Sequence, residues 1–312
     1  MFRLVVLFLG LVLGASSVLA QDLHIIGTGS VVGLYYPVGG AVSFIVNNEV
    51  PDLLLTVKVT PGSVANVEAL SEGDLSLALV QSDVMSEAYQ GHNAFSDRPI
   101  AKLRALMGLH AEPLHLVCRQ DSGVKRLRDV VGKRINLGPE GSGILNTARA
   151  VLAAYKISES QIMASYEAAK QTPELLIEGQ LDCFFFTIGI GGAAIQTTAL
   201  RLPISLIPID GPELMPLLST EPYYSFVTVP AHTYPGVDEA VTLFGVKAFL
   251  VTTTDLPEET AYQIVTSLIE SFNTLKETYP LLETLIKEDV LDGLSIPLHP
   301  GAERAYRELG LL

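Results

Sequence analysis

Four short turns of this chain offer small residues and polar side chains where an apolar, strand-like run gives way to a helix-like one. They are Gly27-Thr-Gly-Ser30, Thr60-Pro-Gly-Ser63, Val80-Gln-Ser-Asp83 and Gly138-Pro-Glu-Gly-Ser-Gly143. Backbone N–H groups at a helix N-terminus are unpaired and carry partial positive charge, so such a turn can hold a small anion. Any one turn could be an ordinary N-cap. Together, split between the two halves of the chain, they predict a cleft lined by hydroxyls and amides that binds a small carboxylate.

Other chemistries fit these residues less well. Gly27, Gly29 and Gly33 match a G-x-G-x-x-x-G nucleotide fingerprint, with Asp52 as a candidate ribose ligand, but the export signal described below argues against a free nicotinamide cofactor. The serines lack the flanking glycines of a nucleophile elbow, and no lysine follows Gly143 as a P-loop requires. The six histidines are scattered without metal-ligand spacing. We therefore expect no catalytic residue, no cofactor and no metal site.

Residues 1–20 have the layout of a secretory signal peptide. Arg3 precedes an unbroken apolar run over 4–13, and small residues follow up to Ala20. This pattern predicts cleavage between Ala20 and Gln21 and a periplasmic mature protein, with an uncleaved anchor as the alternative. The apolar run is shorter than the roughly 20 residues that span a bilayer comfortably.

Charge and cysteine content limit the partners and the compartment. The formal net charge of −14 argues against nucleic acid and against an anionic membrane surface. It does not exclude an anionic ligand, because local N–H groups set the field inside a cleft. Cys118 and Cys183 both lie in strand-like segments, where they could form a disulfide in an oxidising compartment or remain buried free thiols.

Strand-like and helix-like runs alternate along the chain, which is typical of α/β architecture with largely parallel sheets. The predicted strands are 24–26, 54–59, 75–80, 104–109, 114–118, 134–137, 183–186, 204–207 and a segment near 248–252. The predicted helices are 37–48, 64–71, 144–155, 172–178 and 258–279.

The length of 312 residues exceeds one ordinary core and predicts two lobes. No linker halves the chain, so we expect a discontinuous arrangement. Residues 21–113 and 226–312 would form lobe 1, and residues 114–225 would form lobe 2. The chain would cross between the lobes near 112–119 and 224–230.

Two further positions border the turns. Tyr36 directly precedes Pro37, which suits the first position of a helix, so the tyrosine hydroxyl could reach a ligand or the ring could pack in the core. Thr187 follows the apolar run 183–186 and would face the same cleft.

The segment Ile26-Gly-Thr-Gly-x-x-x-Gly-x-Tyr-Tyr-Pro-x-Gly-Gly40 resembles the solute receptors of the TAXI family. These are the extracytoplasmic receptors of a subclass of tripartite ATP-independent periplasmic (TRAP) transporters. The resemblance continues in order over essentially the whole mature chain. It includes Gly62-Ser-Val-Ala-Asn66, Leu77-Ala-Leu-Val-Gln-Ser-Asp83, Asp121-Ser-Gly123, Gly132-Lys-Arg134, Gly141-Ser-Gly143, Tyr234-Pro-Gly-Val-Asp238 and Ile296-Pro-Leu-His-Pro-Gly-Ala-Glu303.

The resemblance implies a two-lobed periplasmic binding protein of the type II kind, in which each lobe is a mainly parallel sheet flanked by helices. It would capture a small organic anion, a dicarboxylate or a related amino acid such as 2-oxoglutarate or glutamate. It would deliver this solute to an ion-gradient-driven TRAP permease with fused small and large subunits, and we expect a monomer. Two alternatives stay open: the receptor of an ATP-driven importer, and an exported enzyme on the same scaffold.

The matching turns supply the expected ligand-binding residues. The resemblance carries over Thr28, Gly29, Tyr36, Ser63, Gln81, Ser142 and Gly143, and we add Ser30, Asn146 and Thr187 from their positions in or beside the turns. The chain departs from the family pattern at Ser30-Val-Val32, where glycine and threonine are frequent, and at Ile144, where threonine is common. Both departures add apolar bulk and leave the polarity and size of the ligand open.

Overall fold

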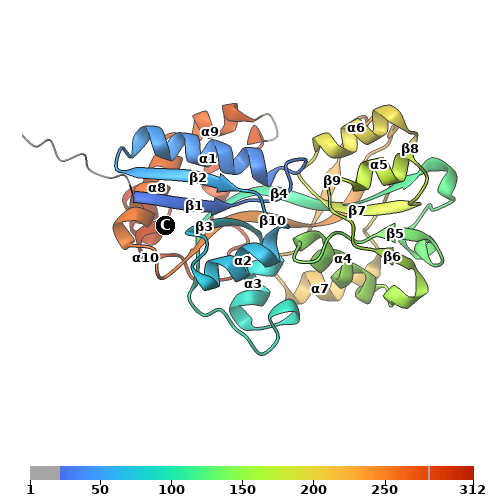
Figure 1. Cartoon of the computed structure of the whole chain (residues 1–312), viewed down its shortest axis with the longest axis horizontal. Coiled ribbons are helices and arrows are strands. Elements are labelled where there is room, and N and C mark those ends of the chain that lie inside the picture. Colours follow the sequence, from blue (N-terminus) through green and yellow to red (C-terminus); the bar gives the residue numbers. More distant parts are fainter. Residues whose placement is uncertain (1–21, 280–281) are drawn as a thin grey trace, which may run out of the picture.

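The computed structural model describes residues 22–279 and 282–312, so the predicted signal peptide lies outside the described residues. Two lobes lie end to end along the long axis of the molecule, and long strands run between them (Figure 1). In the described part of the chain, no helix combines the length and the apolar character needed to cross a bilayer.

The elements alternate largely as the sequence predicts. The strands are β1 (Asp22–Gly27), β2 (Leu53–Lys58), β3 (Leu77–Gln81), β4 (Leu103–Arg119), β5 (Arg134–Asn136), β6 (Met163–Ser165), β7 (Cys183–Thr187), β8 (Ile204–Ile207), β9 (Ser225–Val229) and β10 (Val241–Thr253). The α-helices are α1 (Tyr35–Glu49), α2 (Ser63–Glu72), α3 (Ser82–Gln90), α4 (Gly143–Ala154), α5 (Thr172–Ile177), α6 (Ala193–Arg201), α7 (Met215–Thr220), α8 (Glu258–Glu270), α9 (Phe272–Thr278) and α10 (Pro300–Glu308). The helix predicted over 258–279 is divided at Ser271, whose ψ of 26° departs from helical geometry.

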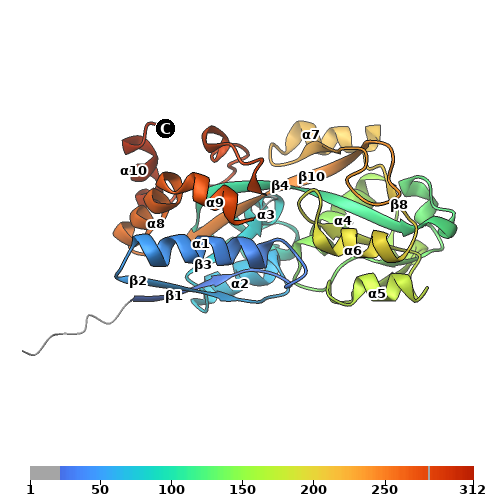
Figure 2. The same ribbon diagram turned by 90° about the horizontal axis from the view of Figure 1, so that it is seen from above.

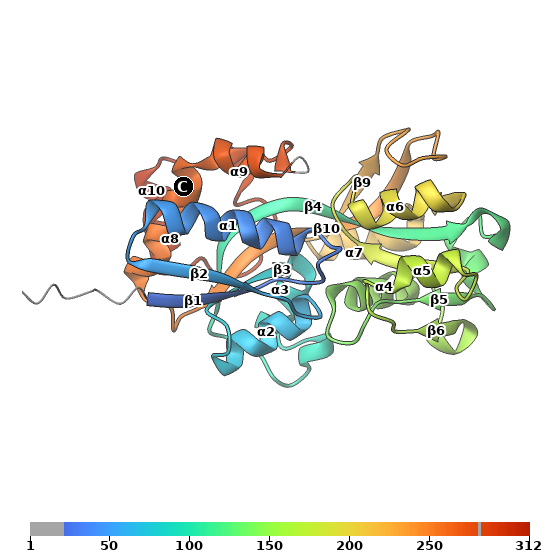
Figure 3. The ribbon, with the colours of Figure 1, turned by 45° about the horizontal axis from the view of Figure 1, so that its top comes forward.

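The strands form one sheet in the order β2-β1-β3-β10-β4-β7-β5-β6, with β8 beside β4 and β9 beside β10. We call the part with β1–β3, α1–α3 and α8–α10 lobe 1, and the part with β5–β8 and α4–α7 lobe 2 (Figures 1 and 3). Within lobe 1, β1 pairs in parallel with β2 and β3, and within lobe 2, β5 pairs in parallel with β6 and β7. The prediction of a two-lobed α/β binding-protein fold is confirmed.

One continuous strand, β4, stands where the sequence predicts two. It pairs with β10 up to Pro113 and with β7 and β8 from Leu114 onward, so the proline lies where the neighbouring strand changes. β10 runs back between the lobes, pairing with β9 over 241–245 and with β3 and β4 beyond. Figure 2 shows β4 and β10 side by side along the molecule. The division of the chain at 113/114 and 225/226 stays a prediction.

The two cysteines form a disulfide, which decides between the two possibilities that the sequence left open. Cys118 and Cys183 are directly opposite each other in the β4–β7 ladder, with Cα atoms 4.0 Å apart. The bond closes a loop with a sequence separation of 65, which by the chain-entropy argument stabilises the fold by about 4 kcal/mol. It ties the crossing strand β4 to the sheet of lobe 2.

Candidate ligand-binding site

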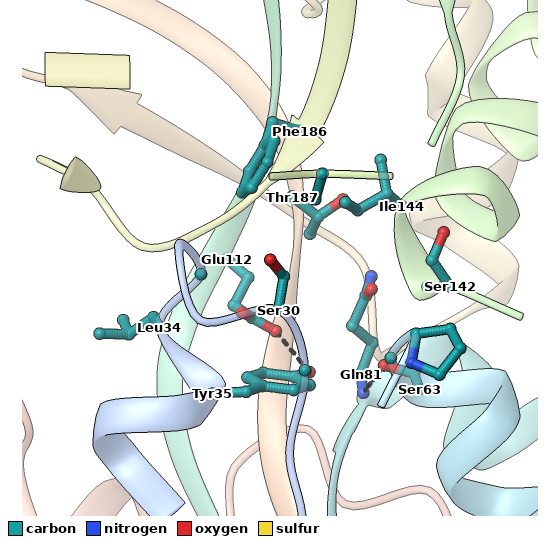
Figure 4. Close-up of a pocket in the computed structure, with 16 residues that line it drawn as sticks. Ser30, Leu34, Tyr35, Ser63, Gln81, Glu112, Ser142, Ile144, Phe186 and Thr187 are labelled. Atoms are coloured by element: carbon teal, nitrogen blue, oxygen red, sulfur yellow. Dashed lines mark hydrogen bonds between the residues drawn. The ribbon is translucent and has the colours of Figure 1, made fainter. Parts of the chain in front are cut away.

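A cavity of about 50 Å³ lies between the two lobes. Its walls come from the loops after β1, β2, β5 and β6, from the last residues of β3 and β7, and from the middle of β4 (Figure 4). This is the carboxyl edge of the parallel strands, where open α/β sheets bind ligands. The lining residues are Gly29, Ser30, Gly33, Leu34, Tyr35, Pro61, Gly62, Ser63, Gln81, Glu112, Ser142, Gly143, Ile144, Ala169, Phe186 and Thr187.

Most of the residues expected from the sequence meet at this cavity. Lobe 1 contributes Gly29, Ser30, Ser63 and Gln81, and lobe 2 contributes Ser142, Gly143 and Thr187. All four turns singled out in the sequence therefore reach one place. Ile144, one of the two departures from the TAXI pattern, also lines the cavity.

Thr28, Tyr36 and Asn146 do not line it. The Thr28 hydroxyl donates a hydrogen bond to the Lys58 carbonyl oxygen (2.8 Å), and the residue is fully buried inside lobe 1. Tyr36 is 38% exposed and lines a second, open pocket together with residues of α5 and α6 from lobe 2. Neighbouring residues on a helix point about 100° apart, and Tyr35 takes the position toward the first cavity. Asn146 turns its amide to Asp83 instead of the cavity (3.3 Å).

Two helix N-termini meet at one side of the cavity, where the Ala65 N–H donates a hydrogen bond to the Gly141 carbonyl oxygen (2.9 Å). α2 begins at Ser63 in lobe 1, and α4 begins at Gly143 in lobe 2. Ser142 caps α4, since its hydroxyl oxygen accepts a hydrogen bond from the Leu145 N–H (3.2 Å). Within the described residues, the N–H groups of Gly143 and Ile144 have no hydrogen-bond partner. This end of the cavity therefore favours a negatively charged group.

A hydroxyl without a partner adds to this donor end. Thr187 is 8% exposed and lines the cavity from the end of β7. Its Oγ1 is buried and makes no hydrogen bond within the described part of the chain. Figure 4 labels this side chain among those that line the cavity. A buried hydroxyl that lacks a partner is costly, so this group is available to a bound molecule.

The α1–β4 side of the cavity holds a buried carboxyl, Glu112, that the sequence-based prediction missed. The Tyr35 hydroxyl donates a hydrogen bond to Glu112 Oε2 (2.8 Å), as Figure 4 shows. His110 Nε2 lies 3.3 Å from Glu112 Oε1. Burial, and next the charge of Glu112, raise the pKa of Tyr35 well above its usual range, so the phenol stays a neutral donor. The signal was present: Glu112 is a single carboxyl within the apolar segment 103–118.

Beside the cavity the lobes touch directly through Gln81, Asp83, Asn146 and Thr147, which we call the interlobe contact. Gln81 Nε2 donates to Thr147 Oγ1 (2.8 Å), and that hydroxyl donates to Asp83 Oδ2 (2.7 Å). Asp83 and Thr147 are fully buried. The chain of hydrogen bonds thus joins a cavity-lining amide to a carboxylate on α3.

Asp83 and Glu87, one turn apart on α3, titrate unusually. Burial is the largest cause in both cases, and it raises the pKa of Asp83 to about 6 and that of Glu87 to about 8. The hydrogen bond from Thr147 opposes the shift at Asp83, whereas the charge of Asp83 adds to the shift at Glu87. Both carboxyls therefore bind protons more strongly in this arrangement than they would in water.

His115, two residues beyond Pro113, is a structural residue. Its Nδ1 lies 2.9 Å from the Pro113 carbonyl oxygen and its Nε2 lies 2.9 Å from the Tyr234 hydroxyl. Burial lowers its pKa to about 4, so the ring is neutral at pH 7. Among the described residues, no group of three or more histidine, cysteine or acidic side chains is placed to hold a metal ion.

Comparisons with known proteins agree with this architecture. A protein from Bordetella bronchiseptica RB50 has a TM-score of 0.58 at 12% identity, over 93% of this chain and 98% of that one. A putative L-cystine ABC transporter from Listeria monocytogenes has a TM-score of 0.53 at 13% identity (85% and 97%). An ancestral arginine-binding protein bound to arginine has a TM-score of 0.54 at 10% identity (84% and 98%). At these identities the likeness shows the fold.

The comparison of the sequence with protein families identifies the family of this chain, which the structural comparison does not. The model of the NMT1-like family matches residues 26–310, which is nearly the whole described chain. The chain therefore belongs to the NMT1-like family.

Proposed function

We propose that this protein is the periplasmic receptor of a TAXI-type TRAP transporter, and that it binds a small carboxylate between its lobes without changing it chemically. The observation that carries this proposal is the cavity itself. Each lobe supplies a helix N-terminus and a hydroxyl or amide side chain to one enclosed space, and the unpartnered Thr187 hydroxyl faces it. The ordered TAXI motifs along the chain support the transporter class.

Binding requires the lobes to move. The cavity of about 50 Å³ has room for a few water molecules and is far smaller than the roughly 300 Å³ of a usual ligand pocket. We propose that the lobes separate about β4 and β10, admit the solute, and close on it. The closed form would be the one that the permease accepts, since only closure brings surfaces of both lobes together.

Of the residues expected from the sequence, we propose that Gly29, Ser30, Ser63, Gln81, Ser142, Gly143 and Thr187 contact the solute. Thr28 and Asn146 would support them through hydrogen bonds to Lys58 and Asp83. Tyr35 and Glu112 join the set because they line the same cavity.

A thermal-shift screen of the mature protein tests the receptor function. Mono- and dicarboxylates, amino acids and sugar acids would be added singly, and a solute at about a hundred times its Kd should stabilise the protein by roughly 2.7 kcal/mol. No shift with any organic anion would contradict the proposal. A compound that binds and is recovered unchanged would exclude the exported-enzyme alternative for that compound.

A pair of N-cap variants localises the binding. Ser142→Asp puts a negative charge at the proposed carboxylate site and should weaken binding strongly, while aspartate remains a good cap for α4. Ser158 also caps a helical turn but does not line the cavity, so Ser158→Asp is the matched control. Equal affinity in the two variants would remove the α4 turn from the binding site.

The second candidate is the receptor of an ATP-driven importer. It is favoured by a solved structure of similar fold described as a putative L-cystine ABC transporter. Reconstitution of the receptor with the permease encoded beside it separates the two. Uptake driven by an ion gradient without ATP supports the TRAP class, and uptake that needs ATP supports the importer.

A further inference from the structure

The ligand cavity has an unusual balance of charge. Glu112 is the only carboxyl among its described lining residues, and none of these residues is lysine, arginine or histidine. The Glu112 side chain is 3% exposed. A solute with two carboxylates would therefore bring a negative charge near Glu112 with no basic side chain in the lining to compensate, which is strongly unfavourable in a buried site.

The neighbours of Glu112 leave part of its hydrogen-bonding capacity free. Tyr35 donates to Oε2 only. His110 Nε2 is 3.3 Å from Oε1, yet neither ring nitrogen of His110 makes a hydrogen bond within the described residues. The contact is thus close enough for electrostatic attraction but lacks hydrogen-bond geometry. Oε1 can accept a hydrogen bond from a bound molecule.

The other end of the cavity has the opposite preference. The free N–H groups of Gly143 and Ile144 begin the 12-residue helix α4, and the unpartnered Thr187 hydroxyl belongs to a residue that lines the same cavity from lobe 2. These groups donate hydrogen bonds and favour negative charge. The cavity therefore presents donors on the lobe 2 side and a carboxyl on the α1–β4 side.

We propose that the solute is a zwitterion whose carboxylate binds the donor end and whose ammonium group binds Glu112, so that Glu112 selects amino acids over the corresponding keto acids and dicarboxylates. This inference rests on the proposed receptor function of the same cavity. It assigns Glu112 and Tyr35 as specificity-determining residues, with Tyr35 fixing the Glu112 carboxyl through its hydrogen bond.

The test compares amino acids with keto acids of the same carbon skeleton. Calorimetric titrations would use glutamate against 2-oxoglutarate, alanine against pyruvate, and leucine against its keto acid, on the wild-type protein and on Glu112→Gln. We expect the wild type to prefer the amino acid of the pair that binds by at least tenfold. In Glu112→Gln the amino acid should lose at least tenfold in affinity, while the keto acid is unchanged or gains.

Glu140→Gln is the matched control. Glu140 lies in the α4 turn, but its side chain is 71% exposed and outside the cavity lining. Its substitution should therefore change the affinity neither for the amino acid nor for the keto acid. If Glu112→Gln does not fold, the proposal is still tested by the wild-type protein, which should bind the amino acid of each pair more tightly than the keto acid.

Three results would overturn the proposal. The first is a wild type that binds keto acids or dicarboxylates as tightly as amino acids. The second is Glu112→Gln with an unchanged preference, and the third is tighter binding of a simple amine without a carboxylate. These results leave an organic solute bound, so they differ from a failure of the receptor function, in which no compound of the screen binds at all.

Discussion

The interlobe contact and the ligand cavity lie side by side between the same two lobes, yet their polar groups differ: those of the contact are hydrogen-bonded to one another, and several of those of the cavity have no partner in the part of the chain that the structure describes. In the interlobe contact, Gln81, Thr147 and Asp83 are joined by hydrogen bonds of 2.7–2.8 Å. In the cavity, the Thr187 hydroxyl and the N–H groups at the start of α4 have no partner among the described residues. The protein thus supplies part of the closing interaction itself and leaves the rest to a bound molecule.

Gly143 belongs to both regions, and its substitution should have the largest effect. A Cβ at this position would lie 1.7 Å from Gln81 Oε1 and 2.9 Å from Ser63 Oγ, and Gln81 is held by Thr147. We expect Gly143→Ala to keep the lobes apart and to weaken solute binding by about a hundredfold or more. Alanine suits a helix, so thermal stability without solute should stay close to that of the wild type.

Gly40→Ala is the control, because a Cβ at Gly40 in α1 meets no atom within 4 Å. Titration calorimetry and thermal unfolding of both variants make the comparison. Full affinity in Gly143→Ala would mean that Gln81 swings aside and that the two regions are less closely coupled than the structure indicates.

Thr147→Val should have the next largest effect. It removes the acceptor for Gln81 and a donor to Asp83, and leaves both partners buried. We expect about a tenfold loss of affinity for every solute, because the loss falls on closure and not on recognition. Thr198→Val is the control, since Thr198 is equally buried but bonds only within α6. A loss confined to one solute would place Thr147 in the recognition site.

The pH dependence of binding should be smaller and arise from the interlobe contact. The pKa of Asp83 is raised to about 6 and that of Glu87 to about 8, so the arrangement seen here holds protons that separated, hydrated carboxyls would release. A raised pKa gives a contribution that is full at low pH and is lost as pH rises through the raised value. Affinity for the solute should therefore weaken as the pH rises from the ordinary carboxyl range near 4 and should level off above about pH 8 to 9.

Groups from several elements face this acidic pair and set the background of the titration. They are Tyr35, Asn93, Glu112, Asn146, Thr147, Glu221, Tyr223 and Tyr224.

Glu87→Gln should flatten the upper part of the pH profile of solute affinity, measured by titration at constant ionic strength. His115, with its pKa lowered to about 4, acts in the opposite direction below about pH 6.5, so the range above pH 6.5 reports on the acidic pair alone. A solute affinity that rises with pH would contradict the assignment of the pH dependence to Asp83 and Glu87.

The smallest effect is expected at Tyr36, which makes it a sharp test against its neighbour. Tyr35→Phe removes the hydrogen bond to Glu112 and should weaken binding several-fold. Tyr36→Phe removes a half-exposed hydroxyl that lies outside the ligand cavity, in the second, open pocket, and should change affinity less than about twofold. A larger loss of affinity in Tyr36→Phe than in Tyr35→Phe would instead support Tyr36, the residue that the sequence suggested, as the one that contacts the solute.

The sequence predicted the positions of the turns better than the direction of their side chains. Gly143 and Ser63 were identified because four turns of similar chemistry precede helices and because these turns match the TAXI pattern, although any single turn could be an ordinary N-cap. Tyr36 was preferred to Tyr35 because it adjoins Pro37, but the phase of α1 turns Tyr35 inward. Asn146 follows the α4 turn as expected, yet its amide bonds Asp83 across the lobes.

What the sequence by itself determined was the alternation of strands and helices, the two-lobed architecture and the four turns, because these depend on apolar periodicity and on local backbone chemistry. Only the tertiary structure decided that two predicted strands are one crossing strand, that Cys118 and Cys183 are bonded, and that Glu112 faces the cavity. These features depend on which distant segments become neighbours, and strand pairing and lobe packing fix that through contacts that no local pattern records.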